Sequence, residues 1–145
     1  MTTVSYDLND YGFTTELRVR LSETDAVGIV FFGSFATYFD VGRMDYLAHL
    51  GLQNFDGVVR DLIPGVVVAQ QVQFHSPATY NDTLALHVRI ACIGSSSYTF
   101  HILATHKRTR ARIASGSLTL VWLSEDFQPV VVPERFRAAI REFEG

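Results

Sequence analysis

Residues 23–35 read ETDAVGIVFFGSF and join two segments whose apolar residues recur with different periods. Before this stretch, residues 16–21 alternate apolar and charged side chains, which predicts a β-strand with one face in water. After it, residues 34–50 carry aromatic and leucine side chains at helical spacing, and Gly51 is well placed to end a helix. At ~1.5 Å per residue this helix is about 25 Å long. The sequence therefore predicts a strand, then a turn and a short apolar stretch, and then one long helix.

From Pro64 onward the apolar residues recur with a period of two, which is typical of β-strands. The breaks between these runs are short enough in two places for antiparallel hairpins. A last amphipathic helix begins at Pro133, in the first-turn position that proline favours. Residues 52–63 are ambiguous, and residues 130–132 are a candidate sixth strand. Four further strands are expected, at residues 66–74, 84–92, 98–104 and 118–122.

The order of strand, helix and then a run of strands favours an α+β fold. A single antiparallel sheet cannot bury one whole face with its own side chains, whereas a helix rich in Phe and Leu laid on that face can. We therefore expect an antiparallel sheet of five to six strands wrapped around one long central helix. The length of 145 residues, without a repeat or a Gly/Ser linker, predicts a single domain over residues 1–145.

The charge and cysteine content exclude several classes of partner. A net charge of -3 and a pI near 5.9 argue against a general affinity for nucleic acid or anionic membranes. The single cysteine, Cys92, allows no intrachain disulfide and no cysteine-rich zinc site, and it falls on the apolar side of an expected strand. The histidines lack metal-ligand spacing, so no metal is expected. Because no apolar run approaches the ~18 residues of a membrane span, and no signal-like N-terminus is seen, we expect a cytoplasmic protein.

The turn and the helix start carry a family resemblance. Asp25 ends the first strand, Gly28 follows three residues later, and an apolar patch leads into an aromatic-rich helix that carries Arg43. This arrangement resembles the 4-hydroxybenzoyl-CoA thioesterase branch of the hot-dog fold. Residues 74–84 are similar to the Pro-Ala loop that leads into the family's third strand. The resemblance covers roughly residues 15–137, which is nearly the whole chain.

The resemblance implies a hydrolase, namely an acyl-CoA or aryl-CoA thioesterase in which the helix N-terminus polarises the thioester carbonyl. It also implies a hot-dog dimer with active sites between subunits, and dimers that pair into a homotetramer. Coenzyme A would be part of the substrate, so no separate cofactor is expected. The hydratase branch of the fold places a His five residues after the Asp, and Val30 stands there in this chain. A non-catalytic acyl-CoA-binding module and an enzyme for carrier-protein thioesters stay open as alternatives.

Asp25 is the candidate catalytic carboxylate. It either attacks the thioester carbonyl or deprotonates water, and the sequence does not separate these two routes. A thiolate with a conjugate-acid pKa of ~8.5 leaves without a general acid. The backbone N–H groups of Phe32 and Gly33 are the candidate oxyanion donors, matching the family's helix start. By spacing alone Asp25 reads as a turn residue that accepts backbone hydrogen bonds. Glu23, two residues earlier on the same side of an extended segment, is either a second carboxylate of the site or, in the favoured interpretation, a solvated surface residue.

The candidate substrate-binding residues are Gly28, which more simply permits a tight backbone turn, and three groups of residues. Aromatic residues near the helix start either line a pocket for an aryl group or pack in the core. Basic residues around one hairpin turn, with one more on a neighbouring outer face, either bind the phosphates of coenzyme A or form a solvated turn. The loop before the third strand would lie near the dimer seam. The set comprises Gly28, Phe31, Phe35, His75, Pro77, Arg89, Arg108 and Arg110.

Overall fold

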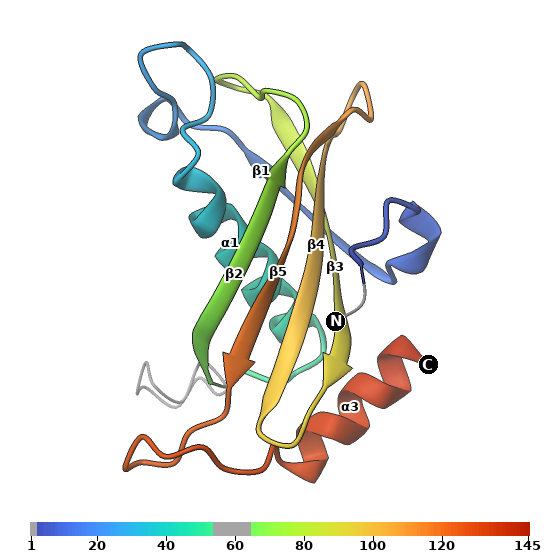
Figure 1. Ribbon diagram of the computed structural model, residues 1–145. Helices are drawn as coiled ribbons and strands as arrows, with labels where there is room; N and C mark the ends of the chain where they lie inside the picture. Colours follow the sequence, from blue (N-terminus) through green and yellow to red (C-terminus); the bar gives the residue numbers. More distant parts are fainter. Residues whose placement is uncertain (1–2, 54–64) are drawn as a thin grey trace.

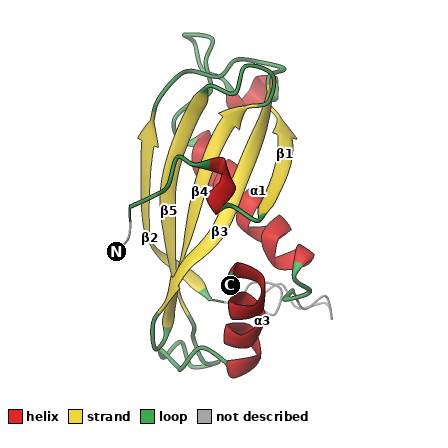
Figure 2. Ribbon diagram, turned by 90° about the vertical axis from the view of Figure 1, so that its right-hand side faces the viewer, coloured by secondary structure: helices red, strands yellow, loops and turns green. Residues whose placement is uncertain are grey.

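A computed structural model describes residues 3–53 and 65–145 of the chain (Figure 1). Five strands form one antiparallel sheet in the order β1-β3-β4-β5-β2. Helix α1 lies along one face of the sheet, and helix α3 packs near the end of β3 (Figure 2). The predicted antiparallel sheet around one long central helix is confirmed, with five strands. The elements are η1 (Leu8–Asp10), β1 (Phe13–Arg18), η2 (Leu21–Glu23), α1 (Ser34–His49), β2 (Val66–Phe74), β3 (Thr83–Ile93), β4 (Ser97–His106), β5 (Arg112–Val121) and α3 (Glu134–Glu144).

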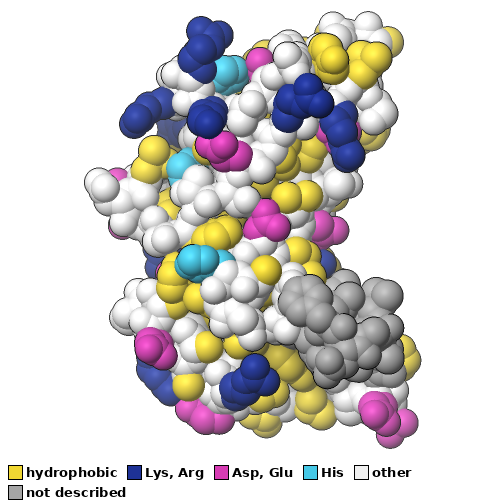
Figure 3. Space-filling model, turned by 180° about the vertical axis from the view of Figure 1, so that it is seen from behind, with side chains coloured by type: hydrophobic (Ala, Val, Ile, Leu, Met, Phe, Trp, Pro, Cys, Tyr) yellow, Lys and Arg dark blue, Asp and Glu magenta, His cyan; other side chains and the backbone are white. Residues whose placement is uncertain are grey.

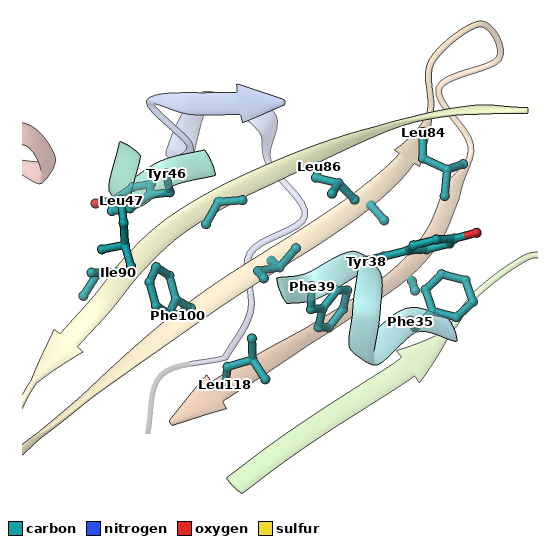
Figure 4. Packing of buried hydrophobic residues seen from close by; sticks show 14 of the residues in the cluster. Phe35, Tyr38, Phe39, Tyr46, Leu47, Leu84, Leu86, Ile90, Phe100 and Leu118 are labelled. Carbon is teal, nitrogen blue, oxygen red and sulfur yellow. The ribbon is translucent and has the colours of Figure 1, made fainter. Parts of the chain in front are cut away.

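Helix α1 begins at Ser34, as predicted, and ends one residue before the predicted end. Gly51 follows with a φ of 67°, the left-handed conformation that glycine adopts without strain. One face of the helix is buried against the sheet (Figure 4). Burying each large apolar side chain on this face contributes about 1.5–3 kcal/mol to the stability of the fold, so this face holds the helix on the sheet. The buried residues, each at most 4% exposed, include Phe35, Tyr38, Phe39, Tyr46 and Leu47.

Two glycines let α1 approach the sheet closely. A Cβ atom on Gly42 of α1 would lie 3.2 Å from Cγ2 of Val88 on β3. A Cβ atom on Gly116 of β5 would lie 2.8 Å from Cε2 of Phe39 and 2.0 Å from the backbone oxygen of Gln71. Position 116 therefore admits only glycine, and the ring of Phe39 packs directly on the β5 backbone.

Two strands begin at least three residues earlier than the sequence predicts. β1 begins at Phe13 instead of residue 16, and Leu21, expected on the buried side, is 69% exposed because η2 turns the chain there. β5 begins at Arg112 instead of residue 118. Residues 114–117 are Ala, Ser, Gly and Ser, whose small side chains hide the alternation although their backbone pairs with both β4 and β2.

The prediction that Cys92 packs in the core is wrong, because this residue is exposed. A β-bulge between Ile90 and Cys92 shifts the alternation, and Ile93 packs against the core in its place. The amide of Ile90 donates to Oε2 of Glu144 at 3.0 Å, and the hydroxyl of Tyr46 donates to the same oxygen at 2.6 Å. Glu144 thereby fastens α3 to both β3 and α1.

The segment before α3 also differs from the prediction. Residues 130–132 form no strand, and the amide of Val132 donates to the carbonyl of Ser95 at 2.9 Å. Pro133 occupies the N-cap of α3 instead of its first turn. The ambiguous stretch at residues 52–63 falls mostly outside the described residues. Within residues 3–53 and 65–145, no helix has the length and apolar character needed to cross a membrane.

The N-terminal segment runs across the face of the sheet opposite α1 (Figure 2). The Tyr6 hydroxyl donates to Oε1 of Gln73 at 3.3 Å, and the Tyr6 ring meets His75 edge-on at 5.3 Å. The ring of Tyr11 lies 6.0 Å from that of His87, which is buried. The sequence predicts an outer face that is wet or covered by a partner. The chain's own N-terminal residues cover part of it instead.

Candidate active site

Residues 23–31 form a small hairpin between η2 and the start of α1. Thr24 and Val30 pair in an antiparallel bridge at its centre. The hairpin is therefore closed at one end by a turn and joined at its other end to the helix. The ladder hydrogen bonds on either side of the bridge run from the Phe31 amide to the Glu23 carbonyl and from the Asp25 amide to the Ile29 carbonyl, each at 2.9 Å.

Asp25 begins the turn of this hairpin and is partly buried. Its Oδ1 accepts the Val27 amide at 2.9 Å, and its carbonyl accepts the Gly28 amide at 3.0 Å. Gly28 has a φ of 93°, so its predicted role as a turn glycine is confirmed. The plainer interpretation of Asp25 as a turn residue thus accounts for one carboxylate oxygen. In the part of the chain that the structure describes, no donor contacts the other oxygen, Oδ2.

The start of α1 leaves two backbone donors unused. The amides of residues 34–36 donate to the carbonyls three residues earlier, at 2.9, 3.2 and 3.3 Å. Among the described residues, the amides of Phe32 and Gly33 have no acceptor. They lie at the positive end of the helix dipole, where an anion is stabilised. A Cβ atom at Gly33 would lie 2.6 Å from Cε2 of Phe31, so a larger residue there would displace the exposed Phe31 ring.

Glu23 is not the solvated surface residue that the sequence suggested. Its side chain is 11% exposed. Oε1 accepts the Arg20 amide and the Tyr38 hydroxyl, each at 2.9 Å. Oε2 accepts Nε of Arg20 at 2.9 Å and Nη2 of Arg20 at 2.6 Å. Burial raises the pKa of Glu23, but the hydrogen bonds from Arg20 and Tyr38 outweigh burial and hold this pKa below its ordinary value.

Glu23 and Asp25 face the same side of the hairpin. Thr24 between them is extended, with φ -99° and ψ 162°, so their side chains leave the chain in the same direction. Glu23 reaches Tyr38 on α1, whereas the side chain of Asp25 contacts the Val27 amide in its own turn. The contact of Glu23 with Arg20 had a signal in the sequence, because the two residues have the i, i+3 spacing of a short helical turn.

A cavity of about 330 Å³ opens beside the Glu23 carboxylate, between β1 and α1. An apolar cavity of about 150 Å³ accommodates benzene, so this volume would hold a small acyl or aryl group. Its wall combines two aliphatic side chains with hydroxyl and charged groups. The lining residues are Leu17, Arg18, Arg20, Glu23, Thr37, Tyr38 and Val41.

The structure separates the aromatic residues singled out in the sequence. Phe31 and Phe32 are 44% and 68% exposed, and their rings lie 4.5 Å apart at the helix start. Phe35 is 4% exposed, and its ring meets those of Tyr38 and Phe74 at 5.4 Å. Phe31 is thus available to a ligand in this chain, whereas Phe35 is part of the core.

The loop before β3 presents His75 and Pro77 at the surface. Nε2 of His75 hydrogen-bonds to Oγ of Ser115 at 2.8 Å, which is the ordinary structural role that a lone histidine favours. The loop also contacts the hairpin, because Thr79 forms a bridge with Ile29 and the Ala78 carbonyl accepts the Val30 amide.

Figure 3 shows Lys and Arg side chains gathered at its upper end, which is the end where α1 begins in Figure 1. Arg108 and Arg110 lie exposed in the turn between β4 and β5. Lys107 and Arg18 belong to the same end, since the Lys107 amide donates to the carbonyl of Thr83, the register partner of Arg18. Arg18 is not among the residues predicted to bind phosphate, because the pairing of β1 with β3 is not visible in the sequence.

Arg89 lies apart from this basic end, so the structure does not bring it together with Arg108 and Arg110. Arg89 pairs with His101 of β4. Along β3 it lies five residues from Leu84, which corresponds to about 17 Å of extended strand. Its Nε atom is buried without a hydrogen-bond partner among the described residues. Over the same residues, no three His, Cys, Asp or Glu side chains are grouped closely enough to hold a metal ion.

Sequence comparison finds relatives among thioesterases. The family model described as "Thioesterase superfamily" matches residues 27–112, which is more than half of the chain. The chloroplastic acyl-acyl carrier protein thioesterase ATL3 of Arabidopsis thaliana is 27% identical over 128 residues, covering 88% of this chain and 67% of that protein. A putative acyl-CoA thioesterase of Bacillus subtilis is 24% identical over 123 residues, covering 83% and 87%.

Solved structures give the same result. A thioesterase from Thermus thermophilus, crystallised with coenzyme A and Zn, has a TM-score of 0.81 and 26% identity over 94% of this chain and 97% of that one. A 1,4-dihydroxy-2-naphthoyl-CoA thioesterase from Synechocystis has a TM-score of 0.80 at 18% identity over 92% and 98%, which is a likeness of fold. Because the family match covers more than half of the chain, including the long helix and three of the strands around it, the chain belongs to the thioesterase superfamily.

Proposed function

We propose that this chain hydrolyses the thioester of an acyl- or aryl-coenzyme A to a carboxylic acid and coenzyme A. What supports the proposal is that, among the described residues, Oδ2 of Asp25 accepts no hydrogen bond and the amides of Phe32 and Gly33, which lead into α1 in the same short segment, have no acceptor. A carboxylate and a pair of oxyanion donors are the groups that thioester hydrolysis needs. The family match begins two residues after Asp25, so the role of Asp25 is argued from this chain's own geometry.

Two routes use these groups. In the first, Oδ2 of Asp25 attacks the thioester carbon, the oxyanion accepts the amides of Phe32 and Gly33, and the thiolate departs with the C–S electron pair. Water then hydrolyses the mixed anhydride and restores the carboxylate. In the second, Oδ2 takes a proton from water as the oxygen of that water attacks the same carbon, and the thiolate again leaves. Both routes use only water and the chain's own groups, so we propose no cofactor.

The charge distribution supports coenzyme A as the leaving group. Arg18, Arg108 and Arg110 lie at the same end of the molecule as the helix start, and guanidinium groups bind phosphates well. A carrier-protein thioester is the second candidate, supported by the Arabidopsis relative, whose name describes an acyl-acyl carrier protein thioesterase. We also propose a reducing compartment such as the cytoplasm, which suits the single exposed Cys92.

A panel of thioesters tests the proposed function. We expect the purified protein to release free thiol from benzoyl-type or medium-chain acyl-coenzyme A, measured with a thiol reagent. The same acyl groups on a phosphopantetheinylated carrier protein and on N-acetylcysteamine separate the two candidates, because the last compound lacks the nucleotide phosphates. No thiol release from any member of the panel would contradict the proposal, and binding without release would indicate a non-catalytic module.

We further propose that the chain forms a homodimer through the edge of β2. β2 is nine residues long and ends the sheet, and an exposed apolar edge of this kind invites pairing with another strand. A second copy can pair with it antiparallel about a two-fold axis, with the same residues on both sides. The exposed apolar residues of β2 are Val66, Val67, Val68 and Phe74, each at least 42% exposed.

Sedimentation tests this interface. We expect a mass of at least twice the 16.2 kDa of the chain, with four copies if dimers pair into a tetramer. Val68→Lys places a charge on the apolar edge that the two copies would bury and should shift the protein toward monomer. Leu21→Lys, at an apolar residue near the opposite edge that is 69% exposed against 57% for Val68, should leave the mass unchanged. A monomeric wild-type protein at micromolar concentration would contradict the dimer.

A further inference from the structure

The two carboxylates of the hairpin differ in how many hydrogen bonds they accept. A carboxylate offers about four lone-pair sites on its two oxygens. Glu23 accepts four hydrogen bonds from Arg20 and Tyr38, so its sites are filled. From the described residues, Asp25 accepts one, from the Val27 amide. Glu23 is therefore unable to serve as a base or nucleophile without breaking its contacts, whereas Asp25 has an oxygen to spare.

The hydrogen bonds of Glu23 join the hairpin to the helix at several points. Its carbonyl accepts the Phe31 amide at 2.9 Å and the Ser34 hydroxyl at 3.1 Å, and Ser34 is the first residue of α1. Its carboxylate accepts the Tyr38 hydroxyl, one turn further along the helix. Figure 4 shows the Tyr38 ring beside Leu84 and Phe35, with its oxygen at the outer side of the core cluster. Tyr38 is thus fixed by the core and can hold Glu23 in place.

We propose that Glu23 is a positioning residue, which with Arg20 and Tyr38 sets the place of the Asp25 carboxylate relative to the amides of Phe32 and Gly33. This proposal rests on the proposed function. Asp25 follows Glu23 by two residues in the same extended segment, and Phe32 follows the residue bonded to the Glu23 carbonyl. The positions of the Asp25 carboxylate and of the Phe32 amide therefore both depend on Glu23. A shift of about 1 Å in such a geometry can lower a rate about 100-fold.

Glu23→Gln tests the positioning role, because glutamine keeps the size of the side chain but loses the charge that faces Arg20. We expect kcat to fall 10- to 100-fold, with KM within about threefold of wild type, since substrate contacts are kept while the reacting geometry is lost. Tyr38→Phe, which removes one donor and keeps the ring in the core, should lower kcat by a smaller factor. Glu23→Asp, with the charge but a shorter reach, should recover part of the rate.

The matched control is Glu16→Gln. Glu16 also pairs with a cation, Lys107 at 3.0 Å, but it lies exposed on β1 away from the hairpin. We expect wild-type kcat for this variant. A wild-type kcat in Glu23→Gln, or a rise in KM with kcat unchanged, would overturn the positioning role, and the second result would point to contact with the acyl group in the neighbouring cavity.

Amide hydrogen exchange tests the same proposal without any turnover. In Glu23→Gln, exchange at the amides of Asp25 and Phe31 should become at least tenfold faster, while the ladder between β3 and β4 exchanges as in wild type. Unchanged exchange at both amides would overturn the proposal. If the wild-type protein released no thiol from any thioester, the proposed function would fail, yet this measurement would still decide whether Glu23 fixes the hairpin.

Discussion

Asp25→Asn is expected to lower kcat/KM for a coenzyme A thioester by about 10³-fold, because it removes the nucleophile or base of both proposed routes. Asparagine keeps a side-chain oxygen that accepts the Val27 amide, so the hairpin turn should persist. The loss would then belong to chemistry and not to folding. Thiol release at saturating and limiting substrate, together with the thermal midpoint of unfolding, checks both statements.

Asp7→Asn is the control that matches this change most closely. Asp7 also caps an amide two residues ahead, that of Asn9 at 2.9 Å, and it lies on the N-terminal segment. We expect wild-type turnover for this variant. Turnover of Asp25→Asn within tenfold of wild type would remove Asp25 from its proposed role and leave the turn as its whole function.

The elements with a strong local pattern were predictable from the sequence. Residues 34–50 repeat at helical spacing and end at Gly51, so the helix was placed within one residue. β2 was placed at its observed bounds. The start of β5 and the exposure of Cys92 were not predictable, because the first depends on pairing by small residues and the second on a bulge opposite β4. Neither the pairing of small residues nor the bulge changes the apolar pattern of its strand in a way that the sequence alone reveals.

The candidate site divides in the same way. Asp25, Phe32 and Gly33 lie within nine residues of one another, so their relation is local and was visible in the sequence. The contact between Glu23 and Tyr38 depends on how the helix returns along the hairpin, and the sequence suggested a solvated Glu23 instead. Arg89 was grouped with the hairpin arginines because a strand pattern shows which face a residue is on, but not how far along the sheet it lies.

Gly116→Ala is expected to lower the free energy of unfolding by about 3 kcal/mol or more, because overpacking a filled interior forces the surroundings to move. The added methyl would lie 2.0 Å from the Gln71 backbone oxygen on β2 and 2.8 Å from the Phe39 ring on α1. For a chain of this length the midpoint of thermal unfolding should fall by roughly 10 °C. Circular dichroism on heating measures this change.

Gly12→Ala is the control, since its Cβ would lie 3.4 Å from the Phe143 ring, an ordinary contact, and it should change the midpoint little. The double variant Gly116→Ala with Phe39→Leu separates the two clashes. If the ring were the main obstacle, the smaller leucine would restore stability. The backbone oxygen of β2 cannot be shortened in this way, so we expect no recovery, and a double variant more stable than Gly116→Ala would show that the helix, and not the β2 strand, requires glycine at position 116.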